Sequence, residues 1–403
     1  MRAAAALALG LALAGQGVAA QEEAAEPWEA RDPGSVRVAA YNVALSRRGA
    51  GLLAQEMAKG GAQIDAVAEI IGRVRPDILV LYEFDRDPAH LALSRFAGRL
   101  RDGAEGLAGL DYPFLYQGPV NTGVPSGHDL DGDGWRRGPR DAFGFGHFPG
   151  QYGTALLSRF PIDHAGVRGF RRFRWADLPG ADRPVMPDGT PFHADAVWQS
   201  LRLSSKSLWD VPVTLPGGAV LHVLASHPTP PVFDGPEDLN GRRNADEIRL
   251  LTGLIEGASW IVDDAGRPGG LDEDALFVVA GDLNADPFDG AARRGALRAL
   301  LAHPRLQDPR PASEGAEAAA ARQGGANARH EGPPGLDTAD WRDEPGPGNL
   351  RVDYVLPSAG LEVTGAGVFW PPPEHPLAPL LAGGRQPASS DHRLVWVDIA
   401  VPD

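Results

Sequence analysis

Apolar residues along the chain fall into short continuous runs and into stretches with helical spacing. The runs at 36–41, 78–82 and 275–280 are typical of strands buried on both faces of a sheet. Residues 64–74 place apolar side chains on one face of a helix, which Pro76 ends. The chain therefore predicts alternating strands and helices around a sheet core. The further predicted elements are strands at 154–157, 220–225, 350–356, 361–370 and 394–401, a hairpin of 200–204 with 208–213, and a helix at 245–256.

Many of these strands end in a side chain that can hold a metal ion or a proton. In the stretch 278–287, VVAGDLNADP, Asp282 and Asn284 leave the end of a buried strand on the same side. Alone, this stretch is more typical of a turn. Carboxylates, amides and imidazoles at several strand ends together indicate a metal-dependent hydrolytic site. The set consists of Asn42, Glu83, His227, Asp282, Asn284, Asp353, Asp391 and His392.

Composition limits the classes of partner. The chain has 403 residues, a 43% hydrophobic share and a formal charge of −15, from 38 Lys and Arg against 53 Asp and Glu. Such acidity is not typical of dedicated binders of duplex DNA or anionic membranes. The stretch 168–174 holds four arginines between aromatic residues. It could grip a phosphate chain, but a strand with one solvated face is the favoured interpretation.

The first residues predict export. Arg2, a short apolar stretch and small residues before Gln21 indicate a signal peptide over 1–20, followed by a polar connector at 21–35. After processing we expect a periplasmic or extracellular protein with no stable membrane insertion. The chain has no cysteine, which excludes disulfides, thiol catalysis and thiolate zinc sites. Carboxylate, amide and imidazole ligands remain, which suit magnesium, manganese or calcium.

One domain is predicted over 36–402, with polar insertions near 121–150, 176–196 and 309–349. The last insertion is dominated by Ala, Gly, Pro and charged residues, with almost no aliphatic side chains. We therefore expect an insertion or flexible loop there, not a second domain.

Two further sites are predicted with open alternatives. Asp129, Asp131 and Asp133 match the first half of a calcium-binding loop, so they either hold a structural Ca²⁺ or form a solvated loop. The second half is missing, because an arginine stands where a bidentate glutamate is needed. Arg243 and Asn244 lie near the start of the predicted helix, where they either bind a substrate phosphate or only cap the helix.

The order of the motifs resembles the endonuclease/exonuclease/phosphatase superfamily, whose members include pancreatic-type deoxyribonuclease. The resemblance runs from about residue 36 to 401, nearly the whole predicted mature chain. It implies an α+β fold, a four-layer α/β/β/α sandwich of two mixed β-sheets with flanking helices, and the alternation of elements is compatible with it. The motifs that carry it are YNV, LVLYEFD, GTALLSRFPI, ASHPTP, VAGDLNADP, VDYVLPS and SSDHRLVWVDI.

The resemblance implies a metal region and a histidine pair. Glu83 would be a direct ligand of a catalytic Mg²⁺ or Mn²⁺, with Asn42 beside it as ligand or orienter. Asp391 would contribute to the same metal region. His392 would engage the scissile phosphate or activate water, and Asp353 would hold it in its tautomer.

The other three positions are implied to act on water and substrate. Asp282 would position or deprotonate the attacking water, and Asn284 would hold a phosphate oxygen. His227 matches the second histidine of the deoxyribonuclease and sphingomyelinase branches, which would stabilise charge or the leaving group.

We therefore expect a secreted, divalent-metal-dependent phosphoesterase that attacks a P–O bond with metal- and histidine-assisted water. Its substrate would be nucleic acid or a small phosphorylated molecule. His227 and the stretch 168–174 slightly favour a nuclease or phosphodiesterase. The alternatives are a phosphatase of inositol phosphates or other small esters, and a non-catalytic calcium-binding surface protein on the same fold. Protein partners stay open.

Overall fold

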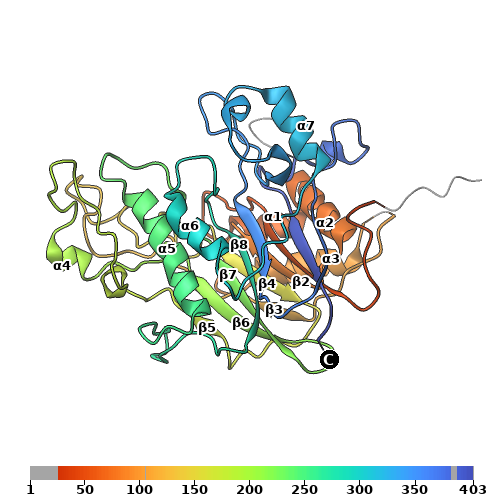
Figure 1. The fold of residues 1–403 in the computed structure, drawn as a ribbon, viewed down its shortest axis with the longest axis horizontal. Coiled ribbons are helices and arrows are strands. Elements are labelled where there is room, and N and C mark those ends of the chain that lie inside the picture. The colour runs from red at the N-terminus through yellow and green to blue at the C-terminus, as the bar shows by residue number, and fades with distance from the viewer. Residues whose placement is uncertain (1–25, 105, 383–387, 403) are drawn as a thin grey trace, which may run out of the picture.

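The computed structural model describes residues 26–104, 106–382 and 388–402 (Figure 1). The predicted signal peptide, 1–20, and the first part of the connector lie outside these residues. In the described part of the chain, no helix is long and apolar enough to cross a membrane.

Two β-sheets form the centre of the molecule. Their strands are β1 Val36–Asn42, β2 Ile78–Tyr82, β3 Phe114–Tyr116, β4 Thr154–Ser158, β5 Arg168–Gly169, β6 Leu208–Thr214, β7 Val220–Ser226, β8 Leu276–Asp282, β9 Asp353–Pro357, β10 Val363–Val368 and β11 Val395–Ile399. The first sheet has the order β10-β11-β1-β2-β4-β3, and β1 and β2 are its parallel pair. The second has the order β5-β6-β7-β8-β9, with β7 and β8 parallel. Each sheet is therefore mixed.

The apolar runs form strands because both faces of each sheet are covered. In β1, Val38 and Ala40 face the core between the sheets, whereas Ala39 and Tyr41 face the outer core of the first sheet. Because successive side chains of a strand point to opposite faces of the sheet, alternate residues of one continuous apolar run pack in two different cores. The same alternation divides β8, β2 and β4.

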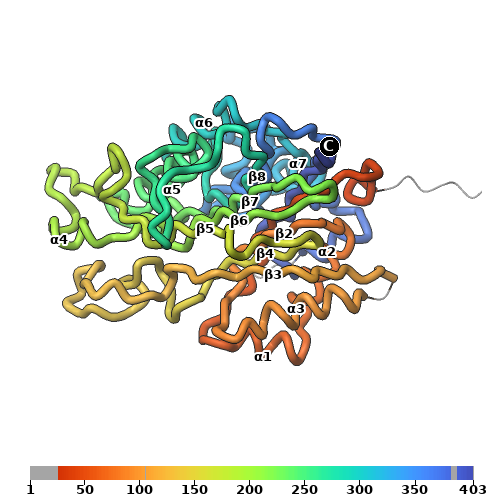
Figure 2. The backbone as a smooth tube through the Cα atoms, turned by 90° about the horizontal axis from the view of Figure 1, so that it is seen from below, coloured from red at the N-terminus to blue at the C-terminus, as the bar shows by residue number. Residues whose placement is uncertain are grey.

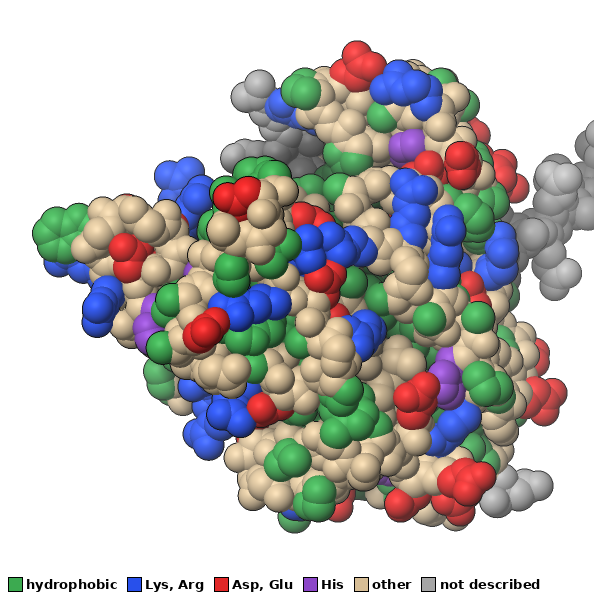
Figure 3. All heavy atoms as spheres, turned by 60° about the vertical axis from the view of Figure 1, so that its left-hand side comes forward, with side chains coloured by type: hydrophobic (Ala, Val, Ile, Leu, Met, Phe, Trp, Pro, Cys, Tyr) green, Lys and Arg blue, Asp and Glu red, His purple; other side chains and the backbone are tan. Residues whose placement is uncertain are grey.

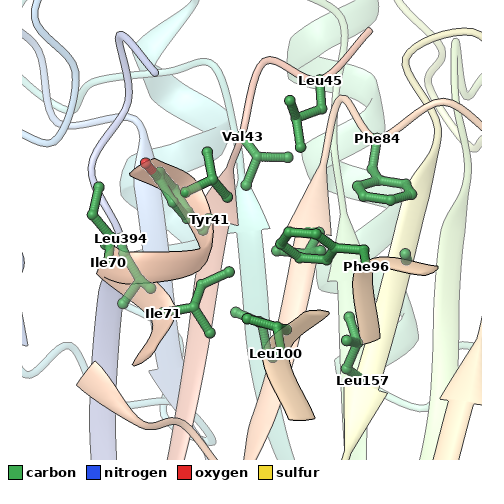
Figure 4. Packing of buried hydrophobic residues seen from close by; sticks show 14 of the residues in the cluster. Tyr41, Val43, Leu45, Ile70, Ile71, Phe84, Phe96, Leu100, Leu157 and Leu394 are labelled. Atoms are coloured by element: carbon green, nitrogen blue, oxygen red, sulfur yellow. The ribbon is translucent and has the colours of Figure 1, made fainter. Parts of the chain in front are cut away.

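Helices cover the two outer faces. The α-helices are α1 Leu52–Lys59, α2 Ala62–Val74, α3 Leu91–Asp102, α4 Asp195–Trp198, α5 Leu239–Ile255, α6 Arg294–Leu301 and α7 Glu314–Gln323, and the 3₁₀ turns are η1 Trp175–Asp177, η2 Asn327–Arg329, η3 Pro334–Leu336 and η4 Ala378–Leu380. Residues of α1, α2 and α3 pack on the first sheet, and those of α5 and α6 on the second. Figure 2 shows the two sheets between these helical layers. In Figure 4, Phe96 and Leu100 of α3 lie against Phe84 and Leu157. The predicted α/β/β/α sandwich is confirmed.

The segment 309–349 is folded, so of the two expected forms, an insertion or a flexible loop, the flexible loop is wrong and the insertion stays a prediction. It contains α7, whose Ser313 cap accepts a hydrogen bond from the Ala316 backbone N–H at 3.3 Å. Ala316 and Ala319 are buried in the same core as the inner faces of the sheets. Alanine has the highest helix propensity and packs closely, so a count of large aliphatic residues missed this helix.

Two local strand predictions are also wrong. Residues 200–204 lie in an irregular segment, so they form no hairpin with β6. In the stretch 168–174 only β5 is extended in a ladder. Its aromatic residues are nevertheless buried, as expected, with Phe170 and Phe173 in the outer core of the second sheet.

Candidate active site

Polar side chains from both sheets meet at one end of the sandwich. The parallel pairs bring the ends of β1 and β2, and of β7 and β8, to this end, where Asn42 and Asp282 are terminal residues and Glu83 follows directly. The antiparallel strands β9 and β11 begin at the same end, because their partners finish there. Asp353 is the first residue of β9, paired in register with Asp282, and His392 lies just before β11.

Asp282 is the centre of the cluster. Its Oδ2 accepts a hydrogen bond from Asn42 Nδ2 at 2.9 Å and lies 3.3 Å from His227 Nε2 and 3.9 Å from His392 Nε2. Its Oδ1 accepts the Asn284 backbone N–H at 3.0 Å. Burial raises the pKa of the Asp282 carboxyl to about 6. The group is thus held beside two imidazoles with a proton affinity suited to exchange near neutral pH.

His392 is paired with a buried carboxylate on its other nitrogen. Its Nδ1 lies 2.9 Å from Asp353 Oδ2 and 3.1 Å from Oδ1. Burial acts to lower the pKa of His392, but the charges of Asp353 and Asp282 outweigh it and hold that pKa well above its usual value. His392 is therefore positively charged near neutral pH, with its Nε2 facing the centre of the cluster.

His227 is the opposite case. It is buried, and desolvation together with the charges of Lys206 and His392 lowers the pKa of its imidazole well below the usual value. Its ring packs edge-on against Tyr82, with centroids 5.2 Å apart. Its Nδ1 has no hydrogen-bond partner among the described residues. The site thus holds one charged and one neutral imidazole.

Glu83 and Asn284 both follow strands and both have left-handed backbone, with φ of 54° and 50°. Non-glycine residues adopt this region at an energetic cost, and such strain gathers at functional sites. The Asn284 Nδ2 donates to the Pro228 carbonyl at 3.2 Å. Glu83 is half-buried, and its carboxylate has no hydrogen-bond or ion-pair partner in the described part of the chain. Desolvation, with the charges of Asp391 and Asp282, raises the pKa of Glu83.

Asp391 lies at the edge of the same cluster. Its Oδ2 accepts a hydrogen bond from the Trp341 indole N–H at 3.0 Å. The Trp341 ring also packs edge-on against His392, with centroids 5.4 Å apart. Trp341 thereby links the segment 309–349 to the site.

This arrangement coincides with a sequence profile. The model of the Endonuclease/Exonuclease/phosphatase family matches residues 39–392, which include every strand-end residue of the cluster. The chain belongs to this family. Its members are phosphoesterase hydrolases, and they generally use divalent metals. No curated protein matches the chain in sequence.

Solved structures of the family share the fold. An endonuclease/exonuclease/phosphatase from Beutenbergia cavernae is 20% identical, with a TM-score of 0.50 over 92% of this chain and 72% of its own. The human Nocturnin catalytic domain is 17% identical, with a TM-score of 0.45 over 91% of this chain and 93% of its own. A mannosyl-6-phosphatase from Bacteroides thetaiotaomicron is 14% identical, with a TM-score of 0.42 over 91% of this chain and 100% of its own. These likenesses concern the fold and leave the substrate open.

The donor groups fit a hard divalent cation. The carboxylates of Glu83 and Asp391 are oxygen ligands of the kind that Mg²⁺ and Mn²⁺ prefer, and that of Glu83 is uncommitted among the described residues. Asn42 uses its amide to hold Asp282, and its Oδ1 accepts the Ala44 backbone N–H at 3.1 Å. This supports an orienting role for Asn42, and its role as a ligand stays a prediction.

A second set of potential ligand atoms is better suited to protons than to metal. One oxygen of Asp282, one of Asp353 and one nitrogen of His392 lie within 4.8 Å of one another. His392 is already bonded to Asp353 and is held in its charged form, and an imidazolium cannot coordinate a metal.

The predicted place of Arg243 and Asn244 near the start of a helix is wrong, and their contact with substrate stays a prediction. Helix α5 begins at Leu239, so both residues lie inside it rather than at its start. Arg243 donates to the carbonyl groups of Leu203 at 2.7 Å and Arg202 at 2.9 Å. Asn244 is fully buried, and its Nδ2 joins the segments after β7 and β8 through two carbonyl groups at 2.9 Å each. Both residues brace the scaffold under the site.

The acidic loop Asp129, Asp131 and Asp133 brings its carboxylates within 4.8 Å of one another. Backbone N–H groups of the loop already occupy some of these oxygens, with Asp129 accepting from Gly132 at 2.7 Å and Gly134 at 2.9 Å. Such bonds are typical of Asx turns. The structural Ca²⁺ stays a prediction.

Lys206 is a site residue that the sequence interpretation missed. It is 6% exposed, and its Nζ donates to the Pro228 carbonyl at 3.4 Å, the same oxygen that Asn284 contacts. Burial lowers the pKa of Lys206, while Glu247, Glu83 and Asp282 act to raise it. Among the described residues no carboxylate lies within ion-pair distance. One signal was available in the sequence, because the chain holds 38 Lys and Arg of which Lys59 and Lys206 are the only lysines.

Proposed function

We propose that the protein is a divalent-metal-dependent phosphoesterase that hydrolyses a P–O bond by attack of water. The observation that carries the proposal is the position of the Asp282 carboxylate, 3.3 Å from one imidazole and 3.9 Å from a second, at the junction of both sheets. A base and an acid placed together in this way can remove a proton from water and return one to a leaving oxygen.

The side chains divide this work. The Asp282 carboxylate takes a proton from the attacking water, and Asn42 keeps its orientation through the 2.9 Å hydrogen bond. The imidazolium of His392 faces the negative charge that grows on the phosphate and gives its Nε2 proton to the leaving oxygen. Asp353 positions His392 and stabilises its charge. The products are a phosphate group and an alcohol, with the proton of the water retained on Asp282 until it returns to solvent.

Glu83 and Asp391, with Asn42 beside them, would hold the divalent cation. A cation bound there supplies positive charge to a phosphate oxygen, which lowers the barrier for an anionic ester. Lys206 adds a buried amine next to Asn284, since both donate to the Pro228 carbonyl. A buried ammonium without an ion pair is unfavourable, so a bound phosphate would compensate it.

Both a phosphodiester and a phosphomonoester fit this machinery. His227 supports a phosphodiesterase, because a second imidazole can stabilise a leaving oxygen. Three of the four arginines in the stretch 168–174 are paired with aspartates, which weakens its support for a nuclease; the pairs are Arg168–Asp263, Arg171–Asp264 and Arg174–Asp177. Figure 3 shows acidic and basic side chains interspersed on one face of the molecule. Small phosphate esters are therefore a candidate equal to nucleic acid.

The predicted signal peptide supports action outside the cytoplasm, in the periplasm or the medium. A fusion of residues 1–20 to a reporter enzyme that is active only after export tests this part of the proposal.

The enzymatic proposal is tested with an activated phosphodiester and an activated phosphomonoester in the presence of Mg²⁺ or Mn²⁺. We expect turnover by the wild-type protein and a loss of at least about a hundredfold in the double variant Asp282→Ala/His392→Ala. The matched control is Asp210→Asn, which removes the charge of a different Asp–His pair, with Asp210 Oδ1 2.7 Å from His222 Nδ1. Activity that survives the double substitution would overturn the assignment. No turnover by the wild-type protein on either ester would favour the non-catalytic alternative.

A further inference from the structure

A cavity of about 720 Å³ lies beside the catalytic cluster. One wall consists of the C-terminal part of α7 and the segment 340–343, and the other consists of residues 370–373 and the turn η4. Figure 1 shows α7 standing beyond the end of the sheets. The family's sandwich does not by itself provide this cavity, because α7 and residues 340–343 belong to the insertion 309–349.

The cavity adjoins the reacting groups directly. Asp391 lines it, and so does Trp341, whose indole N–H donates to Asp391 at 3.0 Å. The ring of Trp341 packs against His392 at 5.4 Å between centroids. The cavity therefore lies next to the side chains that would hold the phosphate.

The floor of the cavity is a buried polar network. Arg393 is 1% exposed and lies over the Trp370 ring, with its guanidinium carbon 4.2 Å from the ring centroid. Its Nη2 donates to Asp340 Oδ2 at 2.9 Å, and Gln323 Nε2 donates to Asp340 Oδ1 at 2.6 Å. Asp340 is thus neutralised within the protein, so the floor does not repel an anion.

The mouth of the cavity carries free positive charge. Arg322 and Arg342 are exposed there, and neither forms an ion pair with any residue that the structure describes. Among the described lining residues, three are arginines and three are aspartates, and Asp340 is already paired with Arg393. Between mouth and floor the walls are apolar and include Pro371, Pro373 and Leu381.

We propose that this cavity binds the organic group of the substrate, and that this group is a ring bearing a second anionic substituent. The inference rests on the proposed phosphoesterase function and deepens it. The volume of the cavity suits a group of nucleoside or sugar size, since ligand cavities of this kind span roughly 300–1,000 Å³. The tryptophan and proline walls contact the ring face, and Arg322 and Arg342 pair with the second anion at the mouth.

The test compares three substrates in steady-state kinetics. They are bis(4-nitrophenyl) phosphate, which has no second anionic group, a small bisphosphate with a nucleoside or a sugar ring, and single-stranded DNA. In the variant Arg322→Gln/Arg342→Gln we expect KM for the bisphosphate to rise at least tenfold with kcat little changed, and the simple diester to stay within about twofold. The control Arg101→Gln removes an arginine of α3 that is 63% exposed, and it should change KM and kcat for neither the bisphosphate nor the simple diester.

Three results would overturn the inference. The first is an unchanged KM of the Arg322→Gln/Arg342→Gln variant for the bisphosphate, and the second is an equal rise of its KM for the simple diester. The third is a rise of KM for single-stranded DNA alone, which would mean that the cavity binds the end of a nucleic-acid chain. The nucleoside and sugar arms show which ring is preferred. Binding of the bisphosphate to His392→Ala, measured by calorimetry, separates this inference from the proposed function. If the bisphosphate binds with an affinity that depends on the two arginines but the wild-type protein does not hydrolyse it, the binding site is supported and the phosphoesterase function is refuted.

Discussion

The pair of His392 and Asp353 offers the sharpest prediction. Asp353→Asn keeps the size of the side chain but removes the charge that lies 2.9 Å from His392 Nδ1. Asp353 is itself 1% exposed, so solvent screens this charge poorly. The substitution therefore acts on the charge and tautomer of the imidazole rather than on packing.

The expected size of the effect follows from the geometry. Two unit charges about 4 Å apart interact by about 4 kcal/mol at an effective dielectric constant of about 20, which equals about three pKa units. Asp282 Oδ2 remains 3.9 Å from His392 Nε2 and retains part of the stabilisation. We therefore expect the pKa of His392 to fall, because the charge of Asp353 is one of those that raise it. Loss of the preferred tautomer should lower kcat by about 10²–10⁴.

The sign of the pH effect is fixed by the role of His392. The pKa of His392 is raised in the folded protein, so the imidazolium persists until the pH rises through that pKa, and activity falls there. In Asp353→Asn this alkaline limb of the kcat profile should move to lower pH. The assay is a pH–rate profile on an activated phosphodiester at saturating metal.

Asp210→Asn is the matched control, because it alters the Asp210–His222 pair and should leave the limb in place. An alkaline limb that stays fixed in Asp353→Asn, whatever the loss of rate, would refute the assignment of His392 as the charged imidazole. A limb that shifts equally in both variants would point to a general effect of charge removal.

Three other predictions concern the metal, the phosphate and the fold. Glu83→Gln should raise the metal concentration that gives half-maximal activity at least about tenfold. Asp282→Asn should lower kcat by about 10²–10³ and leave that metal concentration nearly unchanged, and the reverse pattern would exchange the roles of the two residues. Lys206→Gln should lower kcat/KM by about ten- to a hundredfold while metal titration stays as in the wild type, and unchanged kinetics would exclude phosphate contact. Burial and the neighbouring acids raise the pKa of Asp337 to about 8, so its contribution to stability is lost as pH rises from about 4 to 8. In a denaturant titration at pH 8, the free energy of unfolding of Asp337→Asn should therefore be about 1–3 kcal/mol higher than that of the wild type, with little gain at pH 4. An equal difference between the two proteins at both pH values would contradict this.

The sequence predicted the fold where one physical signal dominated. Runs such as 36–41 and 275–280 are apolar without alternation, which only strands covered on both faces require. Polar residues that stop such runs, including Asp282 and Glu83, had to lie at strand ends. Parallel pairing within each sheet then brought these ends together, and that pairing was implied by the family resemblance alone.

The parts that were missed depend on contacts between distant segments. The start of α5 was placed at Ala245 instead of Leu239 because its first turns, 239–244, are mostly polar, and the buried Asn244 among them hides the inward face of the helix. The Nδ2 of Asn244 donates only to carbonyl groups of the loops after β7 and β8, which a local pattern cannot show. Lys206 likewise reaches the site from an irregular segment, and no periodicity marks it.

The position of β11 has a consequence for the point in synthesis at which the polar cluster can be completed. This strand is synthesised after every other strand described, yet it lies between β10 and β1 in the interior of the first sheet. Until it is inserted, β1 has an open edge and Asp353 has no imidazole to hold, since His392 immediately precedes β11. A polypeptide that still lacks β11 therefore lacks this acid–histidine pair, and the cluster is complete only when β11 has joined the first sheet.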